Sequence, residues 1–363
     1  MTEMETIPIG STIGILGGGQ LGRMLALAAA RLGMKSHIFC PDPDSPAFDV
    51  CTRHTLADYQ DKEALAAFAN TIDVATFEFE NIPAETARQI AAQVPLRPGT
   101  DALSVSQDRI AERAFLARHH IPATRSAPIL SPADMEKAIS ITGLPAILKT
   151  ARLGYDGKGQ RQISSPEQLA DAFTELGRVP AILETRIPFD SEISVIAART
   201  PDEDLCVYDP ACNSHENHIL ATSRVPAPLE PAMREQAIST ARTIAKALDY
   251  CGVLAVEFFV SSTPEVPPLL VNELAPRVHN SGHWTQNGCA TDQFEQHIRA
   301  ICNWPLGSVE RLHDVTMTNL LGDDVLNLPE MLGPDQFPHI YGKRDIRPGR
   351  KMGHINTIAP RTN

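Results

Sequence analysis

The sequence has few of the features that mark a secreted or membrane-bound protein. Its seven cysteines are scattered and form no C-x-x-C pair, so we expect reduced thiols rather than a disulfide framework. The short acidic stretch before the first apolar run is unlike a signal peptide. Every apolar run falls short of the roughly 20 residues that a membrane-spanning helix needs. We therefore expect a soluble, cytoplasmic protein with no membrane partner.

Positive charge is also scarce. The chain has 32 Lys and Arg against 44 Asp and Glu, a net charge of -12. General binding to nucleic acid or to an anionic membrane needs a broad basic surface, and this balance argues against both. A small anionic ligand needs only a local basic pocket, so that class stays open. With 363 residues, 43% of them hydrophobic, the chain has room for two or three packed domains.

Several familiar active-site motifs are missing as well. There is no G-x-S-x-G elbow, no cysteine in a nucleophile motif and no P-loop. Two histidine pairs, His215 with His218 and His279 with His283, have spacings that could mark zinc ligands. Neither pair has the cysteine partners or the H-E-x-x-H helix of a zinc site, so we do not expect zinc.

The stretch TIGILGGGQLG is present near the start, and Gly17, Gly19 and Gly22 fit the G-x-G-x-x-G spacing of a dinucleotide-binding turn. A nicotinamide site would want an acidic residue after the second strand, and Asp42 could serve. That residue lies in the proline-broken PDPDSP, which is equally typical of a plain turn. Strand-like and helix-like runs alternate over the first hundred residues, which predicts a parallel, doubly wound sheet.

A second region begins near Gln107 with the helical QDRIAERAFLARHH. It continues as a long helix over 231–248 and a series of strand-like runs: PAILK, GQRQIS, AILETRI, EISVIAAR, VLAVEFFV and LLVNELAP. The tail from about residue 299 carries a further helix, a strand and a basic stretch.

Two carboxylates stand in the apolar strands of this region. Glu257 lies in the middle of VLAVEFFV, and Glu273 follows Asn272 at the end of an apolar run. A buried carboxylate has to be paired, hydrogen-bonded or bound to a metal. Two of them on neighbouring strands suit Mg²⁺, which takes oxygen ligands and completes its shell with phosphate oxygens. An ion pair to Arg277 or another base is the alternative, and composition leaves both open.

Two further segments favour phosphate ligands. The loop LGYDGKGQ follows a strand that ends in Lys149, and its glycines leave backbone N–H groups free to approach a phosphate. A plain hairpin turn is the alternative. The basic tail invites a phosphate monoester, or else is a solvated loop paired with surface acids. The tail cations are Lys343, Arg344, Arg347, Arg350 and Lys351.

Taken in order, these motifs resemble the N5-carboxyaminoimidazole ribonucleotide synthetases, which are ATP-grasp enzymes of purine biosynthesis. The resemblance covers nearly the whole chain and rests on GGGQLGRML, TFEFENIP, GYDGKGQ, VEFFV, NELAPRVHNSGHWT and YGKRDIRPGRKMGH. It implies an α/β ATP-grasp fold. The implied parts are a doubly wound pre-ATP-grasp domain at 1–106, an ATP-grasp domain at 107–298 whose α+β lid spans about 122–183, and a small C-terminal domain at 299–363.

The same resemblance implies the reaction. Bicarbonate attacks the γ-phosphate of ATP to give carboxyphosphate and ADP, and 5-aminoimidazole ribonucleotide captures the carboxyl group on its amine. The implied cofactor is Mg²⁺, and a homodimer is expected. The opening glycine loop would then bind the phosphoribosyl substrate rather than a nicotinamide cofactor.

Residue roles follow from the matching motifs. Arg277 would neutralise bicarbonate and carboxyphosphate, and Glu257 and Glu273 would hold Mg²⁺. The candidates for orienting the amine or moving its proton are Tyr155, Asp156, His279 and His283. The ribonucleotide residues would be Gln20, Leu21, Glu80, Asn280, Lys343, Arg350 and Lys351. The ATP residues would be Arg109, Lys149, Gly154, Tyr155, Asp156, Gly157, Lys158, Gly159, Gln160, Glu184, Thr185, Arg186, Ile187, Glu192, His215, Asn272 and Glu273.

Three rival functions remain. A formate-dependent glycinamide ribonucleotide transformylase would use the same fold, but Gln20 and Asn280 favour the aminoimidazole enzyme. A biotin carboxylase fits less well, because the chain is short and the basic tail suits a phosphoribosyl group. A nucleotide-binding protein that has lost catalysis is disfavoured because Glu257, Glu273 and Arg277 are all in place.

Overall fold

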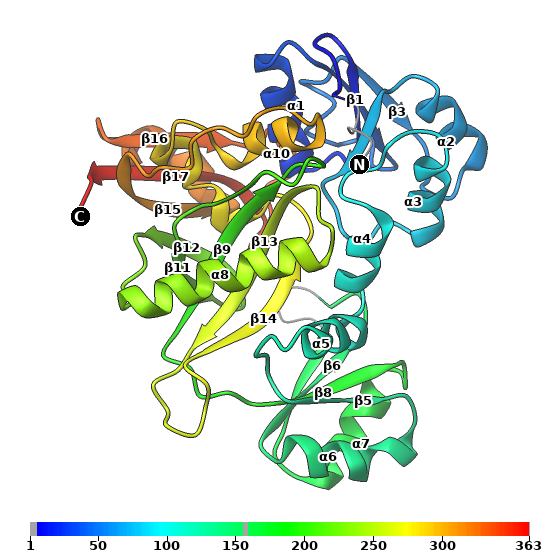
Figure 1. Cartoon of the computed structure of the whole chain (residues 1–363), viewed down its shortest axis with the longest axis vertical. Coiled ribbons are helices and arrows are strands. Elements are labelled where there is room, and N and C mark those ends of the chain that lie inside the picture. Colours follow the sequence, from blue (N-terminus) through cyan, green and yellow to red (C-terminus); the bar gives the residue numbers. More distant parts are fainter. Residues whose placement is uncertain (1–5, 155–158, 363) are drawn as a thin grey trace.

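The computed structural model describes residues 6–154 and 159–362. Within them the chain forms three sheets, of four, nine and four strands. Figure 1 shows the sheets spread along the longest axis of the molecule, with the two small sheets at opposite ends and the large one between them.

The first sheet is parallel, as the alternating sequence pattern predicts. Its strands run in the order β3-β2-β1-β4. Ile13 and Ile15 share a core with helix α1, whereas Leu16 and Phe77 pack with helices α2 and α3, so helices cover both faces. The elements are β1 (Thr12–Leu16), α1 (Gln20–Arg31), β2 (Lys35–Cys40), β3 (Arg53–Leu56), α2 (Lys62–Ala69), β4 (Val74–Phe77) and α3 (Ala84–Ala91).

The chain leaves this sheet through two helices where the sequence predicts one. Asp108 separates α4 (Thr100–Ser106) from α5 (Arg109–Arg118), because its carboxylate accepts the N–H groups of Ile110 and Ala111 and caps α5. Gln107 turns away from both helices and donates to the carbonyls of Glu80 and Ile82, each at 2.7 Å.

The third sheet lies at the far end of the molecule from β1–β4 (Figure 1). Its strands are antiparallel in the order β5-β8-β6-β7, with α6 and α7 on one face. Its elements are β5 (Ser126–Ile129), α6 (Met135–Thr142), β6 (Ala146–Thr150), β7 (Gln160–Ile163), α7 (Pro166–Glu175) and β8 (Ala181–Thr185).

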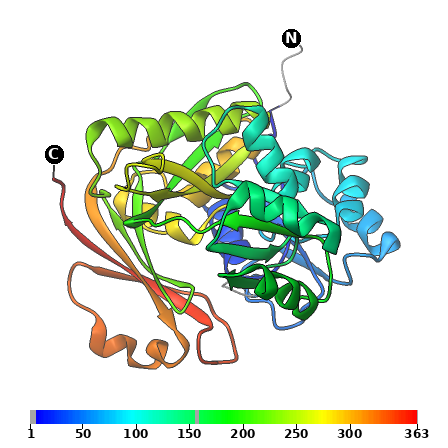
Figure 2. The same cartoon turned by 90° about the horizontal axis from the view of Figure 1, so that it is seen from below.

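The large sheet is antiparallel and is covered on both faces. Val195 and Leu254 pack against α8, while Ile196 and Val253 pack against α10. Strand β12 pairs with β15, so the sheet continues across the boundary predicted at residue 298, and Figure 2 shows the last strands extending along one side of the molecule. The elements are β9 (Ser191–Arg199), β10 (Leu205–Val207), β11 (Ala211–Glu216), β12 (Ile219–Val225), α8 (Pro231–Ala247), β13 (Gly252–Val260), β14 (Leu269–Ala275), α9 (Thr285–Gly288), α10 (Gln293–Ile301), β15 (His313–Leu321), α11 (Leu328–Met331), β16 (Gln336–Ile340) and β17 (Lys351–Pro360).

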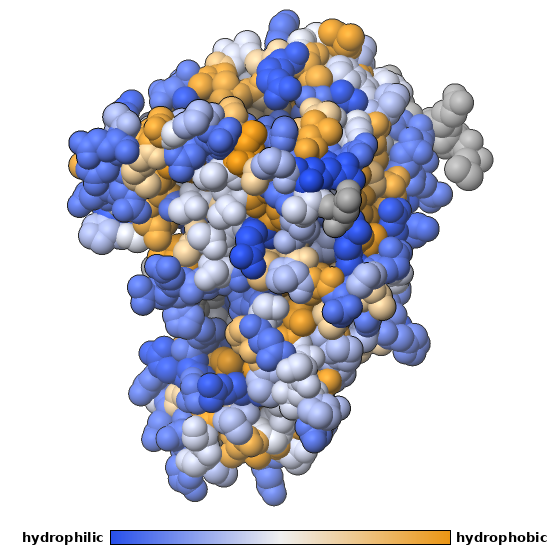
Figure 3. Space-filling model, turned by 90° about the vertical axis from the view of Figure 1, so that its left-hand side faces the viewer, coloured by the Kyte–Doolittle hydropathy of each residue, from blue (hydrophilic) through white to orange (hydrophobic). Residues whose placement is uncertain are grey.

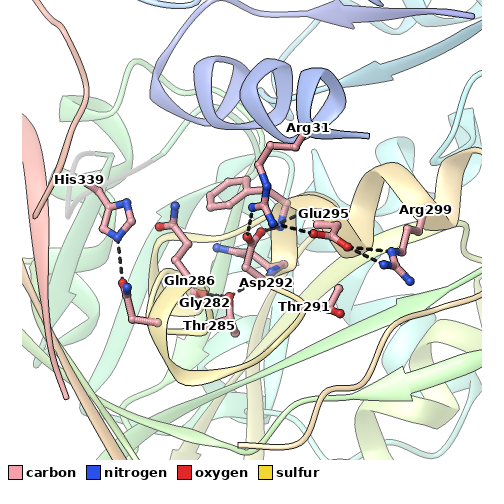
Figure 4. Close-up of polar contacts among 12 residues, drawn as sticks. Arg31, Gly282, Thr285, Gln286, Thr291, Asp292, Glu295, Arg299 and His339 are labelled. Carbon is pink, nitrogen blue, oxygen red and sulfur yellow. Dashed lines mark hydrogen bonds and ion pairs between the residues drawn. The ribbon is translucent and has the colours of Figure 1, made fainter. Parts of the chain in front are cut away.

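Helix α10 joins the first sheet to the large one. Figure 4 shows Arg31 reaching from α1 to Asp292 at 3.3 Å and to Glu295 at 3.0 Å, while Arg299 grips Glu295 from its other side at 2.6 Å. Apolar residues of α1, α10 and the large sheet also share one core. The first sheet is therefore fixed against the large one.

The surface is mixed in character. Figure 3 shows hydrophilic and apolar residues interspersed over the face that lies on the left in Figure 1. Within residues 6–154 and 159–362, every helix is too short or too polar to cross a membrane.

Candidate active site

The two carboxylates singled out in the sequence face each other. Glu257 on β13 stands opposite Glu273 on β14, and the register then shifts so that Asn272 is an extra residue on β14. Opposite residues of an antiparallel pair share a face, with their Cβ atoms about 5 Å apart. Burial, then the charges of Glu273 and Glu192, raise the pKa of Glu257 well above its usual range. Such a pair favours a divalent cation between the carboxylates.

The donor set fits Mg²⁺ that is shared with a nucleotide. Among the described residues, no group of three or more His, Cys, Asp and Glu side chains could hold a metal ion by itself. Two carboxylates leave most of an octahedral shell to water and phosphate oxygens, which is how Mg²⁺ is bound in nucleotide sites. The residues present are therefore compatible with the predicted cofactor.

The two candidate histidines differ in position. His279 Nε2 lies 3.5 Å from Glu257 Oε1. Burial, followed by the charges of Arg277 and Lys351, lowers its pKa well below the usual range, so the imidazole is neutral. His283 is fully buried, bonded through Nδ1 to Gln293 at 3.0 Å. His279 is the one beside the carboxylate pair.

Arg277 pairs with Glu80 rather than with Glu257 or Glu273, the partners that the ion-pair alternative predicts. It binds Glu80 through Nη2 and Oε1 at 2.8 Å and through a second short bond from Nε to Oε2. Burial alone would raise the pKa of Glu80, but Arg277 lowers it; in return Glu80 raises the pKa of Arg277 despite burial. The guanidinium thus stays charged at the end of the strand that carries Glu273.

Among the residues predicted to bind the nucleotide, Lys149 and Glu184 form an ion pair of 2.7 Å. Arg113 holds the other oxygen of Glu184 at 2.8 Å. Burial would raise the pKa of Glu184, yet these two cations lower it to about 2. Sequence reasoning missed Arg113, although a charged residue three positions before Leu116, and so on the same face of the predicted helix, was a detectable signal.

The predicted phosphate loop is anchored at its base. Arg109 donates to the carbonyls of Thr150 at 3.0 Å and Gly154 at 2.8 Å. Gly159 has φ +72°, and its carbonyl accepts from the Thr150 N–H at 2.9 Å. Gln160 begins β7. Tyr155, Asp156, Gly157 and Lys158 lie outside the described residues.

The remaining residues that the sequence predicts to bind the nucleotide lie between β8 and β11. The N–H groups of Thr185 and Arg186 donate to the carbonyls of Arg125 and Pro145, which precede strands of the third sheet. Ile187, the next residue, is half-buried. Glu192 on β9 lies 2.5 Å from His215 Nδ1 on β11. These residues therefore follow the stretch of chain that leads from the third sheet into the large one.

A pocket of about 330 Å³ lies at the carboxyl end of the first sheet. It brings Gln20 together with Lys343 and Arg350, which are more than 300 residues away in the chain. Lys343 Nζ donates to the Lys351 carbonyl at 2.7 Å. Burial and the charge of Arg350 lower the pKa of Lys343 to about 8. The pocket is lined by Gly17, Gly18, Gly19, Gln20, Cys40, Pro41, Asp42, Ser45, Pro46, Tyr59, Glu78, Phe79, Lys343 and Arg350.

Three of the residues that the sequence predicts to bind the ribonucleotide, Leu21, Glu80 and Asn280, do not line this pocket. The Leu21 side chain is 7% exposed and belongs to the core beneath the pocket. Glu80 is occupied by Arg277. Asn280 is 8% exposed and is absent from the pocket lining, and within the described residues neither atom of its buried amide has a hydrogen-bond partner.

Glu78 lines this pocket and was missed by the sequence reasoning. Its carboxylate accepts the N–H of Gly19 at 2.7 Å and of Gly22 at 3.2 Å. Gly17 has φ +111°, and a Cβ there would lie 2.5 Å from the Glu78 side chain. A dinucleotide pyrophosphate would need these same N–H groups at the start of α1. The glycine loop is therefore closed by a carboxylate of this chain, which argues against the nicotinamide hypothesis.

Comparison with family models matches three consecutive parts of the chain. Residues 10–107 match the ribonucleotide synthetase preATP-grasp domain. Residues 114–294 match the ATP-grasp domain, and residues 315–363 match the phosphoribosylaminoimidazole carboxylase C-terminal domain.

Full-length relatives agree. The chain is 46% identical to the N5-carboxyaminoimidazole ribonucleotide synthase of Brucella melitensis, covering 99% of each chain, and 40% identical to that of Bacillus subtilis, covering 95% of this chain and 91% of the relative. A crystal structure of an N5-carboxyaminoimidazole ribonucleotide synthetase with ADP superposes with a TM-score of 0.92 at 38% identity, over 98% of this chain and 94% of that one. The Aspergillus clavatus enzyme with ADP and 5-aminoimidazole ribonucleotide gives 0.88 at 31% identity, over 97% and 94%. The chain therefore belongs to the N5-carboxyaminoimidazole ribonucleotide synthase family, the ATP-dependent ligases of purine biosynthesis that share the ATP-grasp fold.

Proposed function

We propose that this chain carboxylates the amine of 5-aminoimidazole ribonucleotide with bicarbonate, using ATP and giving ADP and phosphate. One observation carries the proposal beyond family membership. Arg277 lies four residues beyond Glu273 and bonds Glu80, which is two residues from Glu78 in the ribonucleotide pocket. Arg277 thus lies between the carboxylates proposed to hold Mg-ATP and the pocket proposed to bind the ribonucleotide. A carboxyl group passed from one substrate to the other would have to cross this region.

The chemistry divides into two steps. A bicarbonate oxygen attacks the γ-phosphorus of ATP, the bond to ADP breaks, and carboxyphosphate forms. The amine then takes the carboxyl group, either from carboxyphosphate or from CO₂ released by it, and phosphate and a proton leave. Mg²⁺ bound at Glu257 and Glu273 would neutralise charge on the ATP phosphates.

The side chains act by position and charge. Lys149 and the loop 154–160 would contact the phosphates, and Arg277 would offset the negative charge of carboxyphosphate. His279 lies 3.5 Å from Glu257 and stays a candidate for orienting the amine or accepting its proton, together with Tyr155, Asp156 and His283. In the second pocket, Lys343 and Arg350 would bind the phosphate of the ribonucleotide.

The remaining nucleotide and substrate assignments of the sequence analysis stay part of this proposal, as do the domain limits and the homodimer. The link at residues 184–187 would contact adenine, and Glu192 would accept ribose hydroxyls. Sedimentation of the purified chain would test the homodimer directly.

The test of function measures ADP release in two reactions, each with Mg-ATP. One holds aminoimidazole ribonucleotide with bicarbonate, and the other holds glycinamide ribonucleotide with formate. We expect turnover only in the first. Turnover only in the second would keep the fold and replace the function with a transformylase, and silence in both would indicate a non-catalytic nucleotide-binding protein.

A further inference from the structure

Helix α5 buries two adjacent charges that the chemistry above does not use. Glu112 is 3% exposed and Arg113 is 8% exposed, and they bind each other at 2.8 Å. Burying ions costs free energy, and a buried pair is often no more stabilising than an apolar replacement of the same size. Their contacts with the rest of the chain therefore point to a role other than stability.

Both charges hold the backbone around Glu273. Glu112 Oε2 accepts the Leu274 N–H at 2.9 Å, and Arg113 Nη2 donates to the Asn272 carbonyl at 2.6 Å. The two residues that they grip flank Glu273 on either side.

The gripped segment is the bulge in β14. Glu257 pairs with Glu273, but Phe258 pairs with Val271, so Asn272 is the extra residue. A bulge disrupts the ladder locally and turns neighbouring side chains, and its backbone groups need other partners. Here α5 supplies those partners.

Arg113 is also linked, through Glu184, to Lys149, the lysine proposed to contact the ATP phosphates. Arg113 binds Glu184 at 2.8 Å, and Glu184 binds Lys149 at 2.7 Å. A continuous row of buried charges thus runs from the large sheet, through α5, to the third sheet.

We propose that Glu112 and Arg113 are positioning residues of the nucleotide site. They fix the bulge, so that Glu273 stays opposite Glu257, and they set Lys149 relative to that pair through Glu184. This inference rests on the proposed function, because it takes the two opposing carboxylates as the metal ligands.

The test compares variants of Arg113 with a matched buried arginine elsewhere. Arg199 is 4% exposed and donates to the Tyr250 carbonyl at 2.8 Å. It lies five residues along β9 from Ser194, the partner of Glu257, or about 17 Å at strand spacing. Mn²⁺ binding to the full-length protein is measured with a non-hydrolysable ATP analogue present, from the electron paramagnetic resonance signal of the free ion. The KM for ATP and kcat are measured in parallel.

We expect Arg113→Met to weaken Mn²⁺ binding about tenfold and to raise ATP KM, with Arg113→Lys and Glu112→Gln intermediate. Arg199→Met should change both by less than about twofold, even where thermal unfolding shows equal destabilisation. Equal metal and ATP affinities in the folded Arg113→Lys, Glu112→Gln and Arg199→Met proteins would overturn the inference.

A further variant separates this inference from the proposed function. Glu257→Gln should abolish Mn²⁺ binding if the opposing carboxylates are the metal site. Unchanged binding in Glu257→Gln would refute the metal assignment itself. Lost binding in Glu257→Gln together with unchanged binding in the α5 variants would refute only the positioning role.

Discussion

Two pairs of glutamates occupy this site, and their surroundings are opposite. At the end of β4, Glu78 accepts backbone N–H groups from the glycine loop 17–22, and Glu80 is clamped by Arg277. Arg277 balances the charge of Glu80 and lowers its pKa, whereas Glu78 has only N–H donors and burial still raises its pKa. Such a pair is built to hold elements together.

Across β13 and β14 the arrangement reverses. Glu257 and Glu273 face each other, and burial with like charge raises the pKa of Glu257. The nearby His279 is held neutral by its surroundings and so supplies no balancing charge. The difference suggests a rule: a carboxylate that donors of the chain meet holds the fold together, whereas a carboxylate that faces a second one, as Glu257 faces the exposed Glu273, is the kind that we propose as a metal ligand.

Glu273→Gln should have the largest effect on activity. We expect kcat/KM to fall by about 10²–10³-fold, because a fixed charge at the transferred phosphate is lost. Thermal stability should hold or increase, since a like-charge contact is removed. ADP release and thermal unfolding measure the two effects. Glu265→Gln, in the exposed β13–β14 connection, is the control, and activity within tenfold of the wild type would contradict the metal role.

Arg277→Met should instead destabilise the fold, because it removes the cation that pairs with Glu80. It strands Glu80 without its cation, so we expect unfolding in urea to lose about 2–3 kcal/mol, somewhat below the fully buried case because both side chains keep some exposure. The double variant Glu80→Gln/Arg277→Met should recover at least half of that loss. No recovery in the double variant would show that packing, rather than charge, sets the cost.

Glu78→Gln should affect the ribonucleotide more than ATP. The amide keeps one acceptor oxygen for the two glycine N–H groups, and burial raises the pKa of Glu78 despite both bonds, so removing the charge relieves a burial cost. The lost bond and the relieved cost oppose each other, and we expect the unfolding free energy to change by less than about 1 kcal/mol. We expect the ribonucleotide KM to rise several-fold while ATP KM stays constant. Exposed Glu85→Gln on α3 provides the control. Equal increases in both KM values would speak against a pocket-specific role.

The smallest expected effect is a pH dependence. Burial and the charge of Arg350 lower the pKa of Lys343 to about 8, so its ammonium form dominates below pH 8 and is lost as pH rises through that value. The ribonucleotide KM should therefore increase by up to about tenfold between pH 7 and 9. Lys343→Arg, which keeps its charge, should flatten the profile. A profile unchanged in Lys343→Arg would assign the titration to another group.

Local patterns were enough for most of the architecture. The alternation of strands and helices predicts the parallel first sheet, and the apolar runs around Glu257 and Glu273 predict two strands. The strand-like run VATFEFE, one of those that alternate with helices in the first hundred residues, forms a strand only as far as Phe77, because the residues beyond it turn to meet the glycine loop and Arg277. That ending depends on contacts with distant segments, which no local pattern contains.

The sequence by itself determined the kinds of chemistry available: opposing carboxylates, a glycine loop and a basic tail, in an order specific to one family. Only the tertiary structure decided which group meets which. Arg277 and Glu80 are 197 residues apart, and Arg113 and Asn272 are 159 apart. Strand pairing and helix packing bring such residues together, because sheet register fixes side-chain direction over many residues at once. Partner choice is therefore a property of the assembled sheets rather than of any motif.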